Sequence, residues 1–490
     1  MLRVTLAVLL LMPALAVAGK ETDAARPNIV LILVDDLGWS DLSCQGSEYY
    51  ETPHIDALAA DGMRFTNGYT CAANCQPTRA ALMSGQYAPR TGVYTVGSED
   101  RFPWETRPLK PVKNVKKLSP KVVTIGESMR AGGYATGYFG KWHLGNDSKH
   151  HPSAQGFEEA IVSKGKHFNF KTIPKVEVPE GIYLADFLTN KSIEFLKRHQ
   201  DEPFFLELAH FAVHSPHQAK PELIARFKDK PAVGGDHDPT YAAMIASVDE
   251  SVGRIVATLD KLGLSENTLV IFTSDNGGLG GYKSVGLKTE QRITDNAPLR
   301  GGKGTFYEGG IRVPYIFRWP GRVEAGAVTD RPINSVDLYA TLLEITGAPR
   351  PDQPLDGETY LGALTGDPSP RGPLYWHFPG YLGYGRHGFP KLQQWRTTPV
   401  GVIRDGDWKL MEFFEDGRLE LYNLRADIGE QNNLAMEHPE RAKRMQQALA
   451  EWREAIGAKM PTAHTPQKKA KSQKKGKKTR KRGRAARENQ

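Results

Sequence analysis

Two pairs of oxygen-bearing side chains come just after predicted buried strands, Asp35 with Asp36 and Asp275 with Asn276. Either pair alone could simply cap a loop. Three carboxylates gathered in one place would repel one another unless a cation lay among them, and oxygen-only ligands suit a hard divalent ion such as Ca²⁺ or Mg²⁺. The two pairs therefore predict a divalent-cation site if the fold brings them together.

A thiol stands at a predicted helix start in the segment Cys75-Gln76-Pro77-Thr78-Arg79. Proline is favoured in the first turn of a helix, where free backbone N–H groups and the positive end of the helix dipole favour an anion. A cysteine is otherwise most often a small buried apolar residue. The segment thus offers either a reactive group in a positive environment or an ordinary core residue.

Two further segments carry lysines that could bind an oxyanion. Lys141 and His143 lie two residues apart in Gly140 to Gly145, so an extended backbone would point both to the same side. A solvated surface face is the alternative. Lys303 lies in the glycine-rich turn Gly301 to Thr305, where backbone can approach an oxyanion closely. The Walker spacing is absent, which argues against nucleotide binding.

These motifs together resemble the formylglycine-dependent (type I) sulfatases of the alkaline phosphatase superfamily, of the arylsulfatase and N-acetylgalactosamine-6-sulfatase kind. Cys-x-Pro-Thr-Arg at Cys75 to Arg79 is similar to the signature whose Cys is oxidised to Cα-formylglycine. Two positions depart from the commoner pattern, Thr78 in place of Ser and Gln86 where a basic residue often stands. The resemblance extends from Pro27 to about Tyr422.

The resemblance implies a role for each motif. Lys141 and Lys303 would hold sulfate oxygens, and His143 would act on the formylglycine hydroxyl. Three histidines compete in His210 to His217, and the following Ser-Pro matches His214 to the substrate-contacting residue. The implied catalytic residues are Cys75, Arg79, Lys141, His143, His214 and Lys303, and the implied metal ligands are Asp35, Asp36, Cys75, Asp275 and Asn276.

The implied reaction is hydrolysis of a sulfate ester, with a carbohydrate or glycan sulfate as the expected substrate. One bound Ca²⁺, in preference to Mg²⁺, would help neutralise the sulfate, and a formylglycine gem-diol would attack sulfur. His214 would protonate the leaving alcohol, and His143 would take the proton whose loss expels inorganic sulfate. A formylglycine-generating enzyme is then a required partner. The alternatives are a formylglycine-dependent phosphonate or phosphodiester hydrolase and a non-catalytic secreted protein that binds polyanions.

The elements that must position these residues alternate between strand and helix. Apolar runs separated by segments of helical spacing favour an α/β fold, with a large mostly parallel mixed sheet flanked by helices. A Pro- and Gly-rich stretch then precedes short strands and one amphipathic helix, which predicts a smaller C-terminal α+β subdomain with an antiparallel sheet. The predicted strands of the large sheet are Asn28 to Val34, Tyr134 to Gly140, Phe204 to Phe211, Leu269 to Thr273 and Val313 to Phe317.

The two ends of the 490-residue chain differ from the rest. Residues 1–18 combine one arginine, a short apolar run and an Ala-x-Ala ending, which predicts a cleaved signal peptide and a secreted or periplasmic protein. The catalytic domain is expected over 26–365, the C-terminal subdomain over 366–462, and a basic tail over 463–490. The tail holds twelve Lys or Arg, more than the net charge of +8, so the remainder is slightly acidic.

Composition limits the remaining possibilities. The run from Val4 to Val17 is too short for a membrane span, and no longer apolar run follows. Because export is expected, nucleic acid is not an expected partner of the basic tail. Three cysteines, Cys44, Cys71 and Cys75, cannot all pair within one chain and do not predict a disulfide framework.

Overall fold

A computed structural model describes residues 26–288, 293–367, 370–384 and 394–467. The predicted signal peptide lies outside these ranges, as does the tail from residue 468 onward. Within the described ranges, no helix has the length and apolarity needed to cross a membrane, and the three cysteines are unpaired.

A nine-stranded sheet forms the centre of the described structure, with strand order β11-β2-β10-β9-β1-β8-β5-β6-β7. The inner strands β9, β1, β8, β5 and β6 run parallel, whereas β10 pairs antiparallel with both β9 and β2. The strand bounds are β1 Asn28–Val34, β2 Met63–Phe65, β5 Ala135–Gly140, β6 Glu159–Ser163, β7 Thr172–Ile173, β8 Phe204–Ala209, β9 Thr268–Ser274, β10 Tyr315–Arg318 and β11 Ala327–Thr329.

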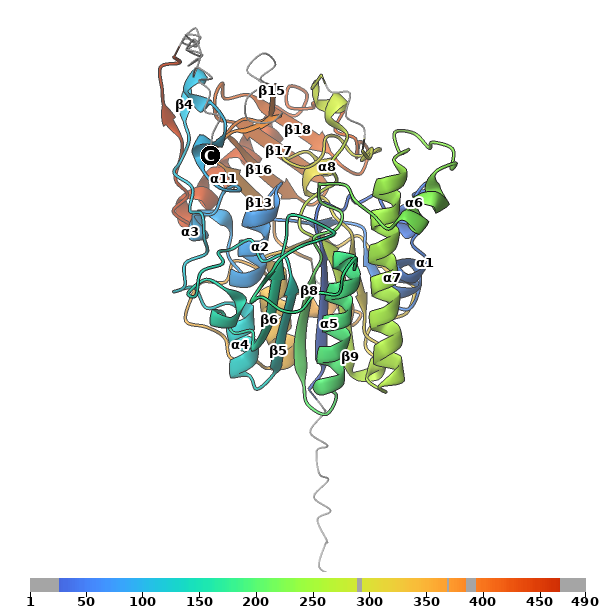
Figure 1. Cartoon of the computed structure of the whole chain (residues 1–490). Helices are drawn as coiled ribbons and strands as arrows, with labels where there is room; N and C mark the ends of the chain where they lie inside the picture. Colours follow the sequence, from blue (N-terminus) through green and yellow to red (C-terminus); the bar gives the residue numbers. More distant parts are fainter. Residues whose placement is uncertain (1–25, 289–292, 368–369, 385–393, 468–490) are drawn as a thin grey trace, which may run out of the picture.

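Helices cover both faces of this sheet because its inner strands are apolar on both sides. Along β1, Val30 and Ile32 pack with α5 and α7, while Ile29 and Leu31 pack with α4 and α9 on the opposite face. Figure 1 shows α5 and α7 side by side across one face. The helix bounds are α1 Pro53–Ala60, α2 Cys75–Ser84, α3 Ala88–Thr91, α4 Ile125–Ala131, α5 Leu184–Arg198, α6 Pro221–Phe227, α7 Pro239–Lys261, α8 Glu308–Ile311, α9 Asp337–Thr346, α10 Leu361–Leu364 and α11 Pro439–Ala455.

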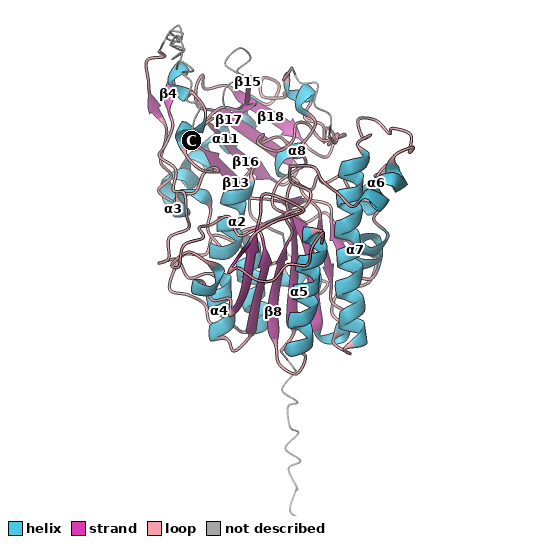
Figure 2. Ribbon diagram, viewed as in Figure 1, coloured by secondary structure: helices cyan, strands magenta, loops and turns pink. Residues whose placement is uncertain are grey.

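A separate antiparallel sheet, in the order β13-β16-β17-β18, lies beyond the carboxyl ends of the large sheet's parallel strands (Figure 2). The helix α11 packs against it through Leu449 and Met445, which meet Ile403 and Leu410. The bounds are β13 Leu374–Phe378, β16 Val400–Asp405, β17 Trp408–Phe413 and β18 Leu419–Asn423. This arrangement confirms the predicted fold class, a mixed α/β sheet with an antiparallel C-terminal sheet.

Short pairings complete the described structure. The strands β3 and β12 pair parallel, and β14 pairs antiparallel with β15. Near the C-terminal end, β19 pairs antiparallel with β4, which ties the last described residues to the loop before α4. The bounds are β3 Gly68–Tyr69, β4 Leu109–Lys110, β12 Ile333–Asn334, β14 Leu382–Tyr384, β15 Gln394–Thr397 and β19 Thr462–Ala463.

Candidate functional site

The two predicted acidic pairs meet where β1 and β9 end. The strands are parallel neighbours in a register that aligns Val34 with Ser274, so the residues that follow them leave the sheet side by side. The backbone N–H of Asp36 donates to Asp275 Oδ1 at 3.3 Å, and Asn276 Nδ2 donates to Asp36 Oδ1 at 2.8 Å. These side chains are buried, so their charges must be balanced by neighbouring groups.

Cys75 is the first residue of α2 and lies above these carboxylates. Its Sγ is 3.9 Å from Asp36 Oδ1 and 3.3 Å from the ammonium nitrogen of Lys303. Burial raises the pKa of the thiol to about 12, although Lys141 and Lys303 act in the opposite direction. An unmodified Cys75 is therefore protonated at neutral pH and a poor nucleophile.

Three cations balance the carboxylates around Cys75. Lys303 Nζ lies 2.5 and 2.7 Å from the two oxygens of Asp36, and Lys141 contacts Asp35. Burial alone would raise the pKa of Asp36, but the charges of Lys303 and Lys141 outweigh this effect and hold the pKa well below its usual value. Lys141 and Lys303 both have raised pKa values despite their burial, mainly through Asp35 and Asp36 respectively. Both lysines are therefore charged.

Arg79, one turn into α2, holds the third carboxylate. Its Nε donates to Asp275 Oδ2 at 2.7 Å, and its Nη1 donates to the backbone carbonyl of Lys141. Burial and the neighbouring Asp35 nevertheless raise the pKa of Asp275 to about 6. The guanidinium thus joins α2 to the segments that follow β9 and β5 in one buried contact.

The donor set fits a hard divalent cation. One oxygen of Asp35 (Oδ1) and the amide oxygen of Asn276 are buried and have no hydrogen-bond partner among the described residues. Ligand atoms of Asp35, Asp36, Cys75 and His214 lie within 4.8 Å of one another. Buried acceptors without partners are costly, and a cation bound by these oxygens would satisfy them.

His214 lies at the edge of this cluster, in the segment after β8. Its Nδ1 lies 2.6 Å from the carbonyl oxygen of Ser215, and its Nε2 lies 3.8 Å from Asp36 Oδ2. A carbonyl can only accept, so Nδ1 carries the hydrogen and Nε2 is left free to take up a proton. Burial, followed by the charge of Lys303, lowers the pKa of His214 to about 3, so the ring is neutral.

His143 reaches the site by a different backbone path from the one expected. The strand β5 ends at Gly140, and His143 has a positive φ of 68°, so the expected extended backbone from Lys141 to His143 is wrong. The pKa of His143 is lowered well below its usual value by burial and by Lys141, with smaller effects from Arg79 and Lys303. The ring is therefore neutral and close to the cations of the site.

The other two histidines of this region, His210 and His217, contact residues outside the group around Cys75. His210 is fully buried, and its Nε2 lies 3.0 Å from the hydroxyl oxygen of Ser251. His217 packs edge-on against Tyr241 at 5.9 Å between ring centroids. Both contacts are of a structural kind.

Three residues near the site did not figure among the sequence-derived candidates. Tyr138 donates its hydroxyl hydrogen to the carbonyl of Lys141 at 2.7 Å. Glu207 is buried in β8 beside Tyr138, within electrostatic range of Arg79. Lys164 directly follows β6. Burial lowers its pKa most, and the charges of Lys141 and Arg79 lower it further. Its place after a parallel strand is the signal that could have identified Lys164.

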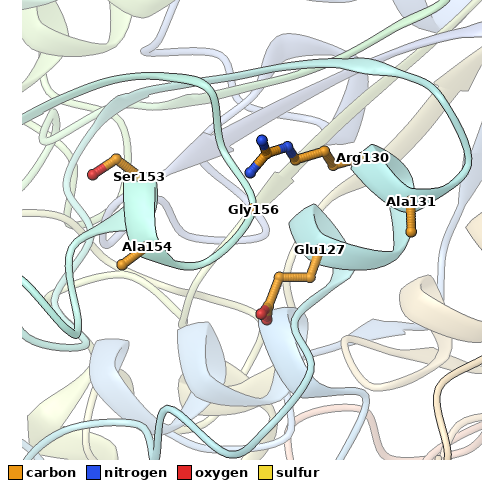
Figure 3. A pocket seen from close by; sticks show the side chains of 6 residues that line it. All are labelled: Glu127, Arg130, Ala131, Ser153, Ala154 and Gly156. Carbon is orange, nitrogen blue, oxygen red and sulfur yellow. The ribbon is translucent and has the colours of Figure 1, made fainter.

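One surface hollow of the described structure contains none of these residues. It has a volume of about 520 Å³ and lies between α4 and the 3-10 helix Pro152–Ala154 (Figure 3). Its charged side chains are Glu127 and Arg130, and Arg130 is already within 3.5 Å of Glu158. The hollow lies beside the amino ends of β5 and β6, whereas the site lies at the carboxyl ends.

Comparisons with known proteins agree with this geometry. The sulfatase family profile matches residues 27–348, and the profile of the N-sulphoglucosamine sulphohydrolase C-terminal region matches residues 302–455. A sulfatase of Formosa agariphila is 34% identical over 91% of this chain and 92% of its own length. An N-acetylgalactosamine-6-O-sulfatase of Bacteroides thetaiotaomicron is 29% identical over 87% of this chain and 93% of its own length.

A solved structure extends the likeness to the fold. The structure of Ps i-CgsB in complex with k-i-k-neocarrahexaose has a TM-score of 0.72 and 30% identity, and the match covers 87% of this chain and 92% of that one. The family profile alone spans well over half of the chain. The chain therefore belongs to the sulfatase family of the alkaline phosphatase superfamily and is a sulfuric ester hydrolase.

Proposed function

We propose that this protein hydrolyses the sulfate ester of a sulfated glycan at the site around Cys75. The observation that carries the proposal is the set of three charged groups, Arg79, Lys141 and Lys303, gathered over buried carboxylates beside the first residue of α2. Sulfate oxygens repel an attacking nucleophile, and preorganised cations offset that repulsion.

Oxidation of Cys75 to formylglycine would supply, once hydrated, the hydroxyl nucleophile that the buried thiol cannot provide. A Ca²⁺ ion would be held by the four side chains Asp35, Asp36, Asp275 and Asn276 together with residue 75, and would supply positive charge for the sulfate oxygens. The buried oxygens without hydrogen-bond partners support this assignment. A formylglycine-generating enzyme is then the maturation partner.

The chain's own residues divide the remaining work. Lys141 and Lys303 would bind sulfate oxygens because both carry a charge in the buried site. A bound sulfate would offset the effect of Lys303 on His214 and so raise the pKa of that ring, which could then donate from Nε2 to the leaving alcohol. His143, neutral at rest, would accept the proton whose loss allows sulfate to depart.

A carbohydrate sulfate is the proposed substrate class because relatives named for N-acetylgalactosamine 6-sulfate and a structure bound to neocarrahexaose are similar over most of their length. We further propose residues 1–18 as a signal peptide of a secreted or periplasmic protein, 26–365 as the catalytic domain, 366–462 as the C-terminal subdomain and 463–490 as the basic tail. The similarity to a phosphonate monoester hydrolase, at 22% identity, concerns the fold alone.

Mass spectrometry of the tryptic peptide Phe65 to Arg79, from protein made in its native host, tests the maturation step. Replacement of the thiol by an aldehyde lowers the peptide mass, and hydration raises it by one water. Rates on an aryl sulfate and an aryl phosphonate then test the reaction. An unmodified Cys75, or a clear preference for the phosphonate, would refute the proposal.

A further inference from the structure

Two arginines from distant parts of the chain lie on neighbouring segments beside the site. Arg101 ends the 3-10 helix Glu99–Arg101, and Arg396 lies in β15. The Arg101 guanidinium lies 5.4 Å from the ring centroid of Phe102, and that ring packs edge-on against Trp395 at 6.3 Å. The aromatic contact between Phe102 and Trp395 therefore brings the segments that carry the two arginines together.

Arg396 rests directly on the turn that carries Lys303. A Cβ atom at Gly304, whose φ is +86°, would lie 2.9 Å from the Cδ of Arg396, so a larger residue there would push the arginine away. The Arg396 guanidinium lies 4.6 Å from the ring centroid of Tyr282, whose hydroxyl donates to the carbonyl of Lys303 at 2.9 Å. The arginine is thus held one residue away from a sulfate-binding lysine.

Arg101 makes no ion pair among the described residues. Arg107, on the same segment, donates from Nε to Glu415 at 3.0 Å. Burial and then the charge of Arg396 lower the pKa of Arg101, and Cys75 acts in the opposite direction. An anion bound between two like charges offsets the repulsion between them.

We propose that Arg101 and Arg396 form a subsite for a second anionic group of the substrate, a sulfate or a carboxylate. This inference rests on the proposed function, because it assigns the substrate class of the same site. Arginine suits the role since its planar guanidinium binds either oxyanion through two parallel hydrogen bonds. The favoured substrate is therefore a glycan with more than one negative charge near the ester that is cleaved.

Binding to a Cys75→Ser protein measures this preference without turnover. The probes are N-acetylgalactosamine 6-sulfate, its 4,6-disulfate, and the 6-sulfate linked to glucuronate, each titrated by calorimetry. We expect at least one of the two doubly charged probes to bind at least about tenfold more tightly than N-acetylgalactosamine 6-sulfate. This is the gain expected from one charge-assisted hydrogen-bonded pair. A preference for the disulfate identifies a second sulfate, and one for the glucuronate identifies a carboxylate.

Arg101→Gln and Arg396→Gln, each in the same protein, should reduce that preference about tenfold. Arg107→Gln is the matched control, because its guanidinium is already paired with Glu415, and it should keep the preference. Equal binding of all three probes, or an unchanged preference in both folded arginine variants, would overturn the proposal. If the mature protein released no sulfate, the proposed function would be refuted instead. The ratio of the probes' affinities for the Cys75→Ser protein does not depend on sulfate release.

Discussion

A buried carboxyl in the centre of the sheet should make the protein's stability depend on pH. Glu207 is 1% exposed in β8, opposite Tyr138 of β5, and its Oε2 has no hydrogen-bond partner among the described residues. Burial raises its pKa to about 8, although the nearby Arg79 and Tyr138 act in the opposite direction. At neutral pH this group keeps its proton in the folded protein and loses it in the unfolded chain.

The sign and size of the effect follow from this difference. Below the unfolded pKa of about 4.5, Glu207 is protonated in both states and its titration changes nothing. Between about pH 4.5 and 8 only the unfolded chain ionises, so the free energy of unfolding falls by about 1.4 kcal/mol per pH unit. Glu207→Gln removes the titration and keeps a similar shape. From pH 5 to 8 the variant should gain about 4 kcal/mol relative to wild type.

Urea unfolding at pH 5, 6, 7 and 8, followed by tryptophan fluorescence, measures this difference. Other groups titrate identically in both proteins, so their contributions cancel. Glu344→Gln, an exposed glutamate of α9, is the matched control and should follow wild type at every pH. Parallel curves for wild type and Glu207→Gln would contradict the prediction, because they would show that Glu207 ionises normally in the folded protein.

Three further predictions concern the metal, the leaving group and the C-terminal sheet. After chelator treatment, Ca²⁺ at about 100 times its Kd should raise the free energy of unfolding by about 2.7 kcal/mol, and Asp36→Asn should weaken this response in thermal melts; no response would contradict the ligand assignment. His214→Gln should lower kcat/KM about 10²- to 10⁴-fold for sugar sulfates but much less for nitrophenyl sulfate, whose leaving group needs no proton; equal losses would exclude proton donation. Lys409 is fully buried 2.9 and 2.8 Å from Glu308 and Glu430, so Lys409→Met should cost about 3–5 kcal/mol in urea unfolding. Adding Glu430→Gln should recover part of that loss, and no recovery would argue against an uncompensated charge.

Much of the fold could be predicted because strand and helix periods are local properties of the sequence. The predicted strand Asn28 to Val34 coincides with β1, and the predicted strand Phe204 to Phe211 begins where β8 begins. The run from Val313 was less accurate, since β10 begins at Tyr315. Val313 donates its N–H to Gly68 instead, a pairing between distant segments that local patterning does not show.

The pairing of charges within the site could not be predicted from spacing. Lys141 contacts Asp35 across 106 residues of sequence, and Arg79 contacts Asp275 across 196. The carboxylate that each cation contacts depends on how the strands and α2 pack and on how far each side chain extends. The sequence therefore indicated the set of charged groups but not their partners.

His143 shows which sequence argument is sound for a site of this kind. Alternation along an extended strand is not what brings it near Lys141, because β5 has already ended and the backbone at His143 is left-handed. These residues lie close together because parallel strands end at the same edge of the sheet. The segments that follow the strands therefore converge there, whichever local turn each one adopts. Lys164, directly after β6, lies near the site for the same reason, although no motif marks it. For such folds, position after a parallel strand is the stronger predictor, and side-chain direction must come from the structure.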